Sequence, residues 1–214
     1  MSGFLAEYGD QIATLTLEHV WLTGVAMLWA VGIAVPLGIL LTRRPRLARP
    51  VLGVVNTLQT IPSLAMFGFL LPLPFVGARA ARIAIVALVA YALLPIVRNT
   101  YAGIRGVDPT VMDVARALGL TGRQRLWKVE LPLAMPYILA GLRTATVTCV
   151  GIATIAAAVG AGGLGELIFR GVASVDNRLV LAGAVPAALL ALAADGMLGL
   201  LERRLRVRGA GQRP

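Results

Sequence analysis

The sequence predicts an all-α integral membrane protein, with about five transmembrane helices and a polar loop of short helices between the third and the fourth. The first observation is composition: 58% of the 214 residues are hydrophobic and 14% are charged, whereas soluble domains carry about 25% charged residues. The second is a set of apolar runs of about 20 residues, the length that crosses a bilayer. The third is that arginines cluster in short segments beside these runs, as in oriented membrane proteins. We treat 1–214 as one transmembrane domain.

The amino-terminal residues 1–19 contain three acidic residues and no Lys or Arg. A cleavable signal peptide starts with basic residues, so we expect an extracytoplasmic tail here instead. The first apolar run covers 20–41, long enough for a hydrocarbon core of about 30 Å. It is followed at once by Arg43, Arg44, Arg46 and Arg49. Because basic loops stay in the cytoplasm, we expect the amino terminus to lie outside.

The second apolar run, 51–73, is interrupted by Pro62 and carries four polar residues: Asn56, Gln59, Thr60 and Ser63. In a continuous helix, three of them (Asn56, Thr60 and Ser63) share one face, at i, i+4 and i+7. Two interpretations remain open. The polar groups bond to neighbouring helices, as polar groups in lipid must, or all four line a solute path.

Three further apolar runs complete the predicted bundle, at 81–100, 137–159 and 179–201. With alternating sidedness, and with Arg98 counted with the segment that it directly precedes, the three inner segments hold 15 of the 20 Lys and Arg residues. The last of these segments is the basic tail that follows residue 201. Because basic residues are retained on the cytoplasmic side, this asymmetry supports five spans and places the carboxyl terminus inside.

The segment 101–132, between the third and fourth runs, is too polar to lie in a bilayer. Asp108 is a suitable N-cap and Pro109 a suitable first residue for a short helix. The apolar positions of this helix recur at helical spacing: Val111, Val114, Ala115 and Leu118. Gly119 ends or bends the helix, and a second amphipathic piece runs to Glu130. A compact helical pair on the cytoplasmic side is suited to contact a partner in the aqueous phase.

Two charged residues lie deep inside predicted spans, away from the span ends. Arg143 lies in the fourth span and Asp195 in the fifth, each about six residues from the inner end, which is roughly 9 Å of helix. An unpaired charge at that depth costs several kcal/mol. Three roles remain open: a structural ion pair, an Arg143 side chain that reaches back to the interface, or a direct role in transport.

Several activities are disfavoured by the residues themselves. The G-x-G-x-x-G pattern of Gly160, Gly162 and Gly165 follows a membrane span rather than a strand, so we expect a turn or gate, not a dinucleotide site. A P-loop needs Gly-Lys-Ser/Thr, and the only lysine, Lys128, follows a tryptophan. We therefore expect no catalytic residues, and no metal beside the single histidine, His19. The net charge of +10 lies in short loops beside apolar runs, which disfavours nucleic-acid binding.

The polar segment resembles the signature of permease subunits of binding-protein-dependent ABC importers. That signature reads E-A-A, three residues, Gly, nine residues, then Ile-x-Leu-Pro. Both spacings are kept here, in Asp113-Val114-Ala115, Gly119 and Val129-Glu130-Leu131-Pro132. The departures are Asp113 for Glu, Val114 for Ala and Val129 for Ile, each mild in charge or shape.

Four further stretches are similar to the glycine betaine/carnitine/choline (osmoprotectant) permeases. They are Q-T-I-P-S-L-A from Gln59, Y-A-L-L-P-I-V-R-N-T-Y-A-G-I from Tyr91, G-L-R-T-A-T-V from Gly141, and G-A-G-G-L-G from Gly160. The resemblance implies the core of a type I importer in the bacterial cytoplasmic membrane. It also implies a second permease, identical or related, an ATPase dimer that binds ATP and Mg²⁺, and a separate extracytoplasmic solute-binding protein. The chain itself, in contact with lipid, would bind no cofactor.

The resemblance further implies that the helix around Asp113 docks in a groove of the ATPase. The residues expected to couple the two subunits are Asp113, Val114, Ala115, Leu118, Gly119, Leu131 and Pro132. Other functions remain open: an importer of methionine or another amino acid, an ion-driven carrier or channel subunit, or a membrane scaffold without a transport path.

Overall fold

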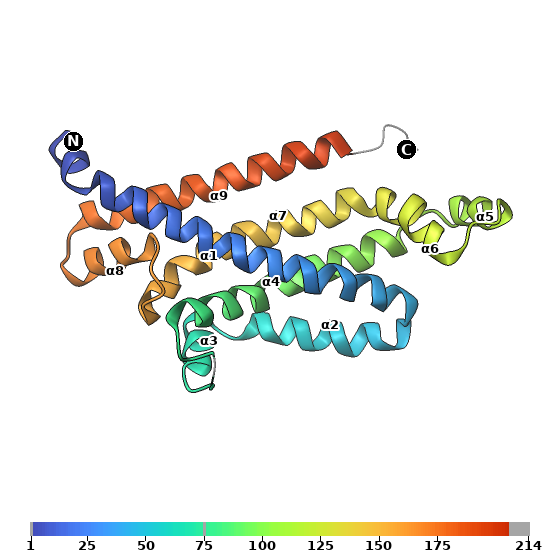
Figure 1. Cartoon of the computed structure of the whole chain (residues 1–214), viewed down its shortest axis with the longest axis horizontal. Helices are drawn as coiled ribbons and strands as arrows, with labels where there is room; N and C mark the ends of the chain where they lie inside the picture. The colour runs from blue at the N-terminus through green and yellow to red at the C-terminus, as the bar shows by residue number, and fades with distance from the viewer. Residues whose placement is uncertain (1, 75, 206–214) are drawn as a thin grey trace.

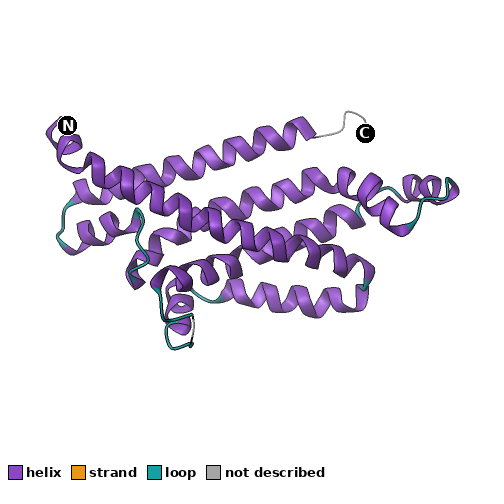
Figure 2. Ribbon diagram, viewed as in Figure 1, coloured by secondary structure: helices purple, strands orange, loops and turns teal. Residues whose placement is uncertain are grey.

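The computed structural model describes residues 2–74 and 76–205, and within them the chain is helical with short connecting loops and no strand (Figure 2). This confirms the predicted all-α class. The end of the basic tail, from residue 206 on, lies outside the described residues. The helices are α1 Ser2–Arg43, α2 Pro45–Thr60, α3 Ser63–Leu70, α4 Ala80–Arg105, α5 Pro109–Ala117, α6 Gly122–Arg125, η1 Leu126–Glu130, α7 Leu131–Ile155, η2 Ala156–Val159, α8 Gly165–Ala173 and α9 Asn177–Leu205.

Four helical stretches of the described residues are long and apolar enough to cross a membrane. They are Tyr8–Arg43, Ala80–Arg105, Gly122–Val159 and Asn177–Leu205. A fifth span is present if the bent pair α2 and α3 is counted as one. The long helices lie side by side along one axis, with α8 near one end and the short helices α5 and α6 at the other (Figure 1).

The predicted amino-terminal tail, 1–19, is part of a helix from Ser2 on, continuous with the first span. Neither proline nor a glycine pair interrupts it before residue 20. The side chain of Leu15 is 5% exposed and belongs to a cluster with Leu164 and Leu167 of α8 and Leu179 of α9. The tail is therefore helical because its apolar face packs against the α8 end of the bundle, a contact between segments far apart in sequence.

The predicted second span, 51–73, is not one straight helix. Its two halves, α2 and α3, meet at an angle of 100°. Pro62 disfavours the helical conformation at Ile61, which adopts extended angles, φ −70° and ψ 126°. Helix α4 supports the break, since the Tyr91 hydroxyl donates to the carbonyl of Ile61 and the Gln59 amide donates to the carbonyl of Tyr91 at 2.7 Å.

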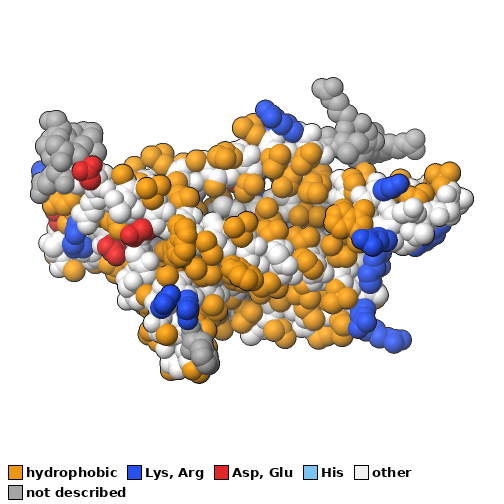
Figure 3. Space-filling model, in the orientation of Figure 1, with side chains coloured by type: hydrophobic (Ala, Val, Ile, Leu, Met, Phe, Trp, Pro, Cys, Tyr) orange, Lys and Arg blue, Asp and Glu red, His pale blue; other side chains and the backbone are white. Residues whose placement is uncertain are grey.

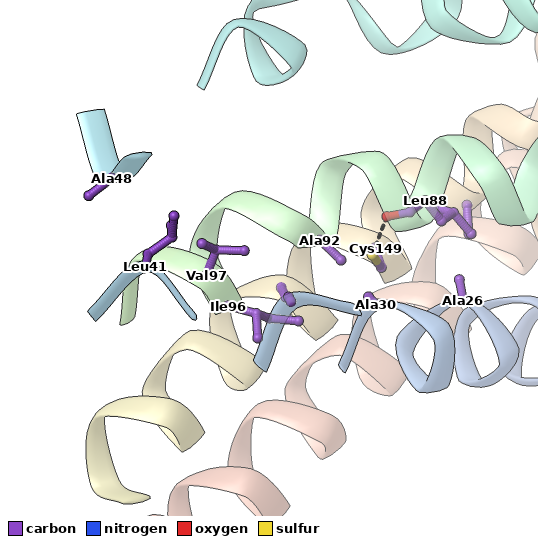
Figure 4. Packing of buried hydrophobic residues seen from close by; sticks show 12 residues of the cluster. Ala26, Ala30, Leu41, Ala48, Leu88, Ala92, Ile96, Val97 and Cys149 are labelled. Carbon is purple, nitrogen blue, oxygen red and sulfur yellow. Dashed lines mark hydrogen bonds between the residues drawn. The ribbon is translucent and has the colours of Figure 1, made fainter. Parts of the chain in front are cut away.

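Helix α4 lies at the centre of the bundle, between α1 and α7. The surfaces that meet there are lined by small side chains. Ala30 of α1 lies toward Ala92 of α4, Ala26 lies toward Leu88, and the Cys149 thiol of α7 points to the carbonyl oxygen of Leu88 at 3.5 Å (Figure 4). All of these side chains are fully buried. Cys149 is thus a small core residue.

Three glycines bring the backbones of these helices close together. A Cβ atom on Gly38 of α1 would lie 2.7 Å from the Thr100 side chain of α4, and one on Gly141 of α7 would lie 2.7 Å from the Pro95 carbonyl oxygen and from Asn99 Cβ. A Cβ on Gly103 of α4 would lie 2.8 Å from Tyr137. Since lipid offers no hydrophobic force between helices, such close contacts supply much of the packing energy.

Charged pairs join helices near the α5–α6 end. Between α7 and α9, Arg143 Nη2 donates to Asp195 Oδ2 at 2.6 Å and Arg143 Nε donates to Oδ1. Glu202 of α9 lies 3.9 Å from Arg143 Nη1. The two charged residues predicted at equal depth therefore form an ion pair in the structure.

Substituting Gly141 tests the close approach of α7 to α4. We expect Gly141→Ala to destabilise the protein by about 1–3 kcal/mol, because the new methyl group overlaps backbone that cannot move. The matched control is Gly151→Ala on the same helix, where a Cβ meets nothing within 4 Å. Thermal midpoints of both variants in detergent check this, and equal midpoints would contradict it.

The Arg143–Asp195 pair can be tested by a double-mutant cycle. We expect Arg143→Gln and Asp195→Asn each to lower the thermal midpoint, and the double variant to lose less than the sum of the two, because each single change leaves one charge without its partner. Arg203→Gln, at an exposed arginine of α9, serves as the control. Strictly additive losses would show that the two side chains are not coupled.

Candidate functional site

A protruding segment, residues 106–130, extends past the ends of the long helices and connects α4 to α7 (Figure 1). Helix α5 begins as predicted, since the Asp108 carboxylate accepts a hydrogen bond from the Thr110 N–H at 2.7 Å and Pro109 follows it. Thr121 caps α6, with its hydroxyl and the Gln124 side chain bonded reciprocally to the backbone. Both short helices are therefore fixed by their own caps.

Gly119 ends α5 in the left-handed conformation, with φ +74°. Its N–H donates to the Arg116 carbonyl at 2.9 Å, and the N–H of Leu120 donates to the Ala115 carbonyl at 3.1 Å. Glycine is the residue that reaches this conformation without steric cost, and the pattern is a common helix ending. The sharp turn predicted at Gly119 is thus present.

The protruding segment exposes apolar side chains although it lies outside the bundle. Val114 is 55% exposed, Leu118 is 74% exposed and Val111 is 40% exposed, whereas Ala115 is buried. Trp127 is 64% exposed nearby. Lys and Arg side chains gather at this end of the visible face, while acidic side chains gather at the opposite end (Figure 3). An exposed apolar patch rimmed by charge is typical of a protein-binding surface.

Asp113, predicted to belong to the same surface, is exposed and pairs with Arg116, with an oxygen–nitrogen distance of 2.7 Å. Leu131 and Pro132 do not join this surface. Leu131 is 8% exposed and packs with Ile104 of α4 and Ala134 of α7. The seven predicted coupling residues therefore fall into two groups. One lies on α5 and its turn and is exposed except for Ala115, and the other lies at the base of the protruding segment, where α7 begins, with Leu131 buried and Pro132 exposed.

Glu130 anchors this base, a role that the sequence analysis did not assign. Its side chain is 3% exposed, and both of its oxygens accept hydrogen bonds from Arg43 at the end of α1, one of them at 3.1 Å. Glu130 ends the π-helix η1 and immediately precedes α7. The protruding segment is thereby bonded to α1 as well as joined covalently to α4 and α7.

A cavity of about 530 Å³ opens among α2, α4 and α7. Its lining residues are Gln59, Tyr91, Leu94, Pro95, Arg98, Asn99, Thr144, Thr148 and Ile152. Of the four residues predicted to line a path, only Gln59 takes part. Asn56 and Thr60 are exposed on α2, and Ser63 belongs to α3 beyond the break. The predicted common face of Asn56, Thr60 and Ser63 does not form because Pro62 ends the helix between the last two.

Four polar residues of the cavity were not selected from the sequence: Arg98, Asn99, Thr144 and Thr148. The two threonines stand at i and i+4 in the fourth span, a signal that could have identified them as one face. Asn99 Nδ2 donates to the Pro95 carbonyl at 2.7 Å, and the Thr144 hydroxyl donates to the Ala140 carbonyl at 3.1 Å. These local bonds fix the orientation of both side chains.

The glycine-rich loop at the other end of the bundle is a turn, as predicted. Gly160, Gly162 and Gly163 have φ values of +76°, +84° and +81°. The N–H of Gly163 donates to the Glu18 carboxylate of α1 at 3.1 Å. The adjacent His19 is fully buried, with Nε2 3.0 Å from the Val150 carbonyl oxygen. This loop therefore binds a carboxylate of its own chain.

Comparison with curated proteins gives full-length relatives. The chain is 43% identical over 206 residues to the choline transport system permease protein OpuBB of Bacillus subtilis (strain 168), covering 96% of this chain and 94% of that protein. It is 42% identical to the glycine betaine/carnitine/choline transport system permease protein OpuCB of the same strain, covering 98% and 95%. It is 41% identical to the osmoprotectant import permease protein OsmW of Salmonella typhimurium, strain LT2, covering 96% and 97%.

Solved structures are similar as well. An inward-facing form of the MetNI methionine ABC transporter matches with a TM-score of 0.78 and 25% identity, covering 88% of this chain and 93% of that chain. An amino acid ABC transporter crystallised with histidines matches with a TM-score of 0.70 and 20% identity, covering 94% and 96%, which shows a common fold. The model of the family described as binding-protein-dependent transport system inner membrane component matches residues 34–207. The chain thus belongs to the family of inner membrane permease components of binding-protein-dependent transport systems.

Proposed function

We propose that this chain is the permease subunit of an ATP-driven importer of osmoprotectants such as glycine betaine, choline and carnitine. The observation that carries the proposal is identity above 40% to three such permeases over nearly the whole chain. The methionine importer shares the fold at 25% identity. Sequence likeness therefore favours an osmoprotectant over methionine or another amino acid as the solute.

The proposed partner of the protruding segment is a dimer of ATPase subunits that binds ATP and Mg²⁺. Two observations support this. The apolar side chains of Val114 and Leu118 are exposed to water, and burying each in a groove would contribute about 1.5–3 kcal/mol. The exposed Asp113–Arg116 pair would add about 0–1 kcal/mol at the rim. Lys128 follows a tryptophan, so the chain has no P-loop of its own, and we assign it no catalytic step and no cofactor.

Movement of the ATPase would reach the bundle through the base of the protruding segment. Gly119 allows α5 to turn sharply, and Glu130 bonds the segment to Arg43 of α1. A displacement of α5 would therefore shift the ends of α1, α4 and α7 together, which is the kind of rigid-body motion that opens and closes a transport path.

The orientation that we propose puts the protruding segment in the cytoplasm and the amino terminus outside. The excess of basic residues near the protruding segment supports it. A solute-binding protein would then dock near the loop that contains Gly163. The exposed Asn56 and Thr60 on α2 would face lipid or the second permease copy or paralogue, and Gln59 would face the path through the cavity.

Uptake by the complete transporter tests the proposed function. Cells that lack their other osmoprotectant importers, and that express this chain with its ATPase and binding protein, should accumulate radiolabelled betaine, carnitine or choline. Uptake should stop when the P-loop lysine of the ATPase is replaced, because in this proposal the ATPase subunit supplies the energy for transport. Accumulation that continues with the inactive ATPase would contradict the proposal.

Leu118→Arg tests the docking surface. We expect copurification of the ATPase, and with it uptake, to fall at least about tenfold, because the lost apolar contact is worth 1.4 kcal/mol or more. The amount of the chain in the membrane should not change, since Leu118 is 74% exposed. Val175→Arg, at an 88% exposed valine in the turn between α8 and α9, is the matched control and should leave copurification of the ATPase unchanged, because this turn lies at the opposite end of the bundle (Figure 1). Normal copurification with Leu118→Arg would remove the docking role.

A further inference from the structure

Arg98 is the one charged side chain that lines the 530 Å³ cavity. It has no ion pair and no hydrogen bond to another described residue. Arg98 is an exposed residue of α4 without a partner in the described part of the chain, whereas Arg143 is paired with Asp195 and Arg43 with Glu130. Charged groups within a membrane span normally have a partner. The residues around Arg98 therefore indicate which kind of ligand could bind its guanidinium group.

Arg98 lies near the inner end of the third predicted span, 81–100, within α4. It precedes Arg105, the last residue of α4, by seven residues, or about 10 Å of helix. Tyr91 lies the same distance further along and lines the far end of the cavity. The cavity therefore runs along α4 for about two turns, with a positive charge at its α5–α6 end.

The polar groups beside Arg98 suit a small anion. One N–H of the Asn99 amide is bonded to the Pro95 carbonyl at 2.7 Å, which leaves the second N–H to donate. Thr148 brings a hydroxyl to the lining from α7. A guanidinium group is planar and binds a carboxylate through two parallel hydrogen bonds. No Asp or Glu lines the cavity to compete for it.

The remaining lining residues suit a quaternary ammonium group, as found in a solute that also carries a carboxylate. Leu94, Pro95 and Ile152 are apolar, and the Tyr91 hydroxyl is already bonded to the Ile61 carbonyl. Apolar and aromatic walls accommodate the methyl groups of a quaternary ammonium. Betaine and carnitine carry a carboxylate besides this group, whereas choline carries a hydroxyl in its place. A cationic cavity thus attracts one end of the first two solutes and repels choline, which has a net positive charge.

We infer that Arg98 is the carboxylate-binding group of a solute site in this cavity, and that it makes the permease favour carboxylated quaternary ammonium solutes over choline. The inference rests on the proposed function and goes beyond it, because it assigns selectivity to this chain as well as to the binding protein. The competing role for Arg98 is that of an interface arginine, which orients the helix and has no effect on the ranking of solutes.

Uptake by Arg98 variants separates the two roles. In the complete transporter, Arg98→Gln should lower the maximal uptake of betaine and carnitine about tenfold, the usual size of a lost charge-assisted hydrogen bond. Choline uptake should stay the same or rise, because the charge that repels choline is removed. Arg98→Lys, which keeps the charge, should retain most of the betaine uptake. The matched control is Arg105→Gln, two turns along the same helix and outside the cavity lining, which should leave all rates unchanged.

Protection of a cysteine in the cavity gives a measurement that needs no binding protein. Thr144→Cys, in a Cys149→Ala background of the purified transporter, places a thiol in the lining for an uncharged maleimide. Millimolar betaine should slow labelling more than choline at equal ionic strength, and Arg98→Gln should abolish the difference.

The possible outcomes separate a failure of the Arg98 inference from a failure of the proposed transport function. If Arg98→Gln lowers uptake of all three solutes equally, or of none, the inference is wrong while the proposed function stands. If the unmodified transporter takes up none of them, the proposed function is wrong. In that case the labelling experiment still decides the inference, because equal protection by betaine and choline would overturn it.

Discussion

The close approach of α4 to α1 and α7 is the constraint on which the rest of the structure depends. In lipid, apolar side chains gain little by leaving their solvent, so helices associate where small residues let backbones touch. Gly38, Gly103 and Gly141 provide these contacts. These contacts fix the position of Asn99 in the cavity lining. They also fix the distance between the end of α4 and the start of α7, which the protruding segment connects. The positions of the cavity lining and of the protruding segment are thus fixed by glycines that carry no reactive side chain.

Much of the architecture could be predicted because it follows from local physics. Hydropathy and charge are properties of segments, so the long apolar helices and the polar segment between α4 and α7 were found correctly. The caps of α5 were predicted because Asp108 and Gly119 act on their own backbone. The family resemblance rested on spacing within this same segment, and the comparisons confirm it.

What could not be predicted depends on contacts between distant segments. The helical tail is stabilised by Leu164 and Leu167, about 150 residues from Leu15. The bend at Pro62 was marked by a proline, but its angle depends on bonds to Tyr91. The cavity lining combines three helices, and a periodic pattern within one helix says nothing about its neighbours. Glu130 looked like one more polar residue of a loop because its partner, Arg43, ends the first helix.

Helix α1 is bonded at two distant points, to Glu130 through Arg43 and to Gly163 through Glu18. The 25 residues between Glu18 and Arg43 correspond to about 37 Å of helix, longer than the hydrocarbon core of about 30 Å. A single continuous helix therefore connects Glu130, at the base of the protruding segment, to the loop that contains Gly163 at the other end of the bundle. If this helix tilts about its middle, its two ends move in opposite directions, so a displacement at the α5–α6 end would be accompanied by an opposite displacement at the glycine-rich loop.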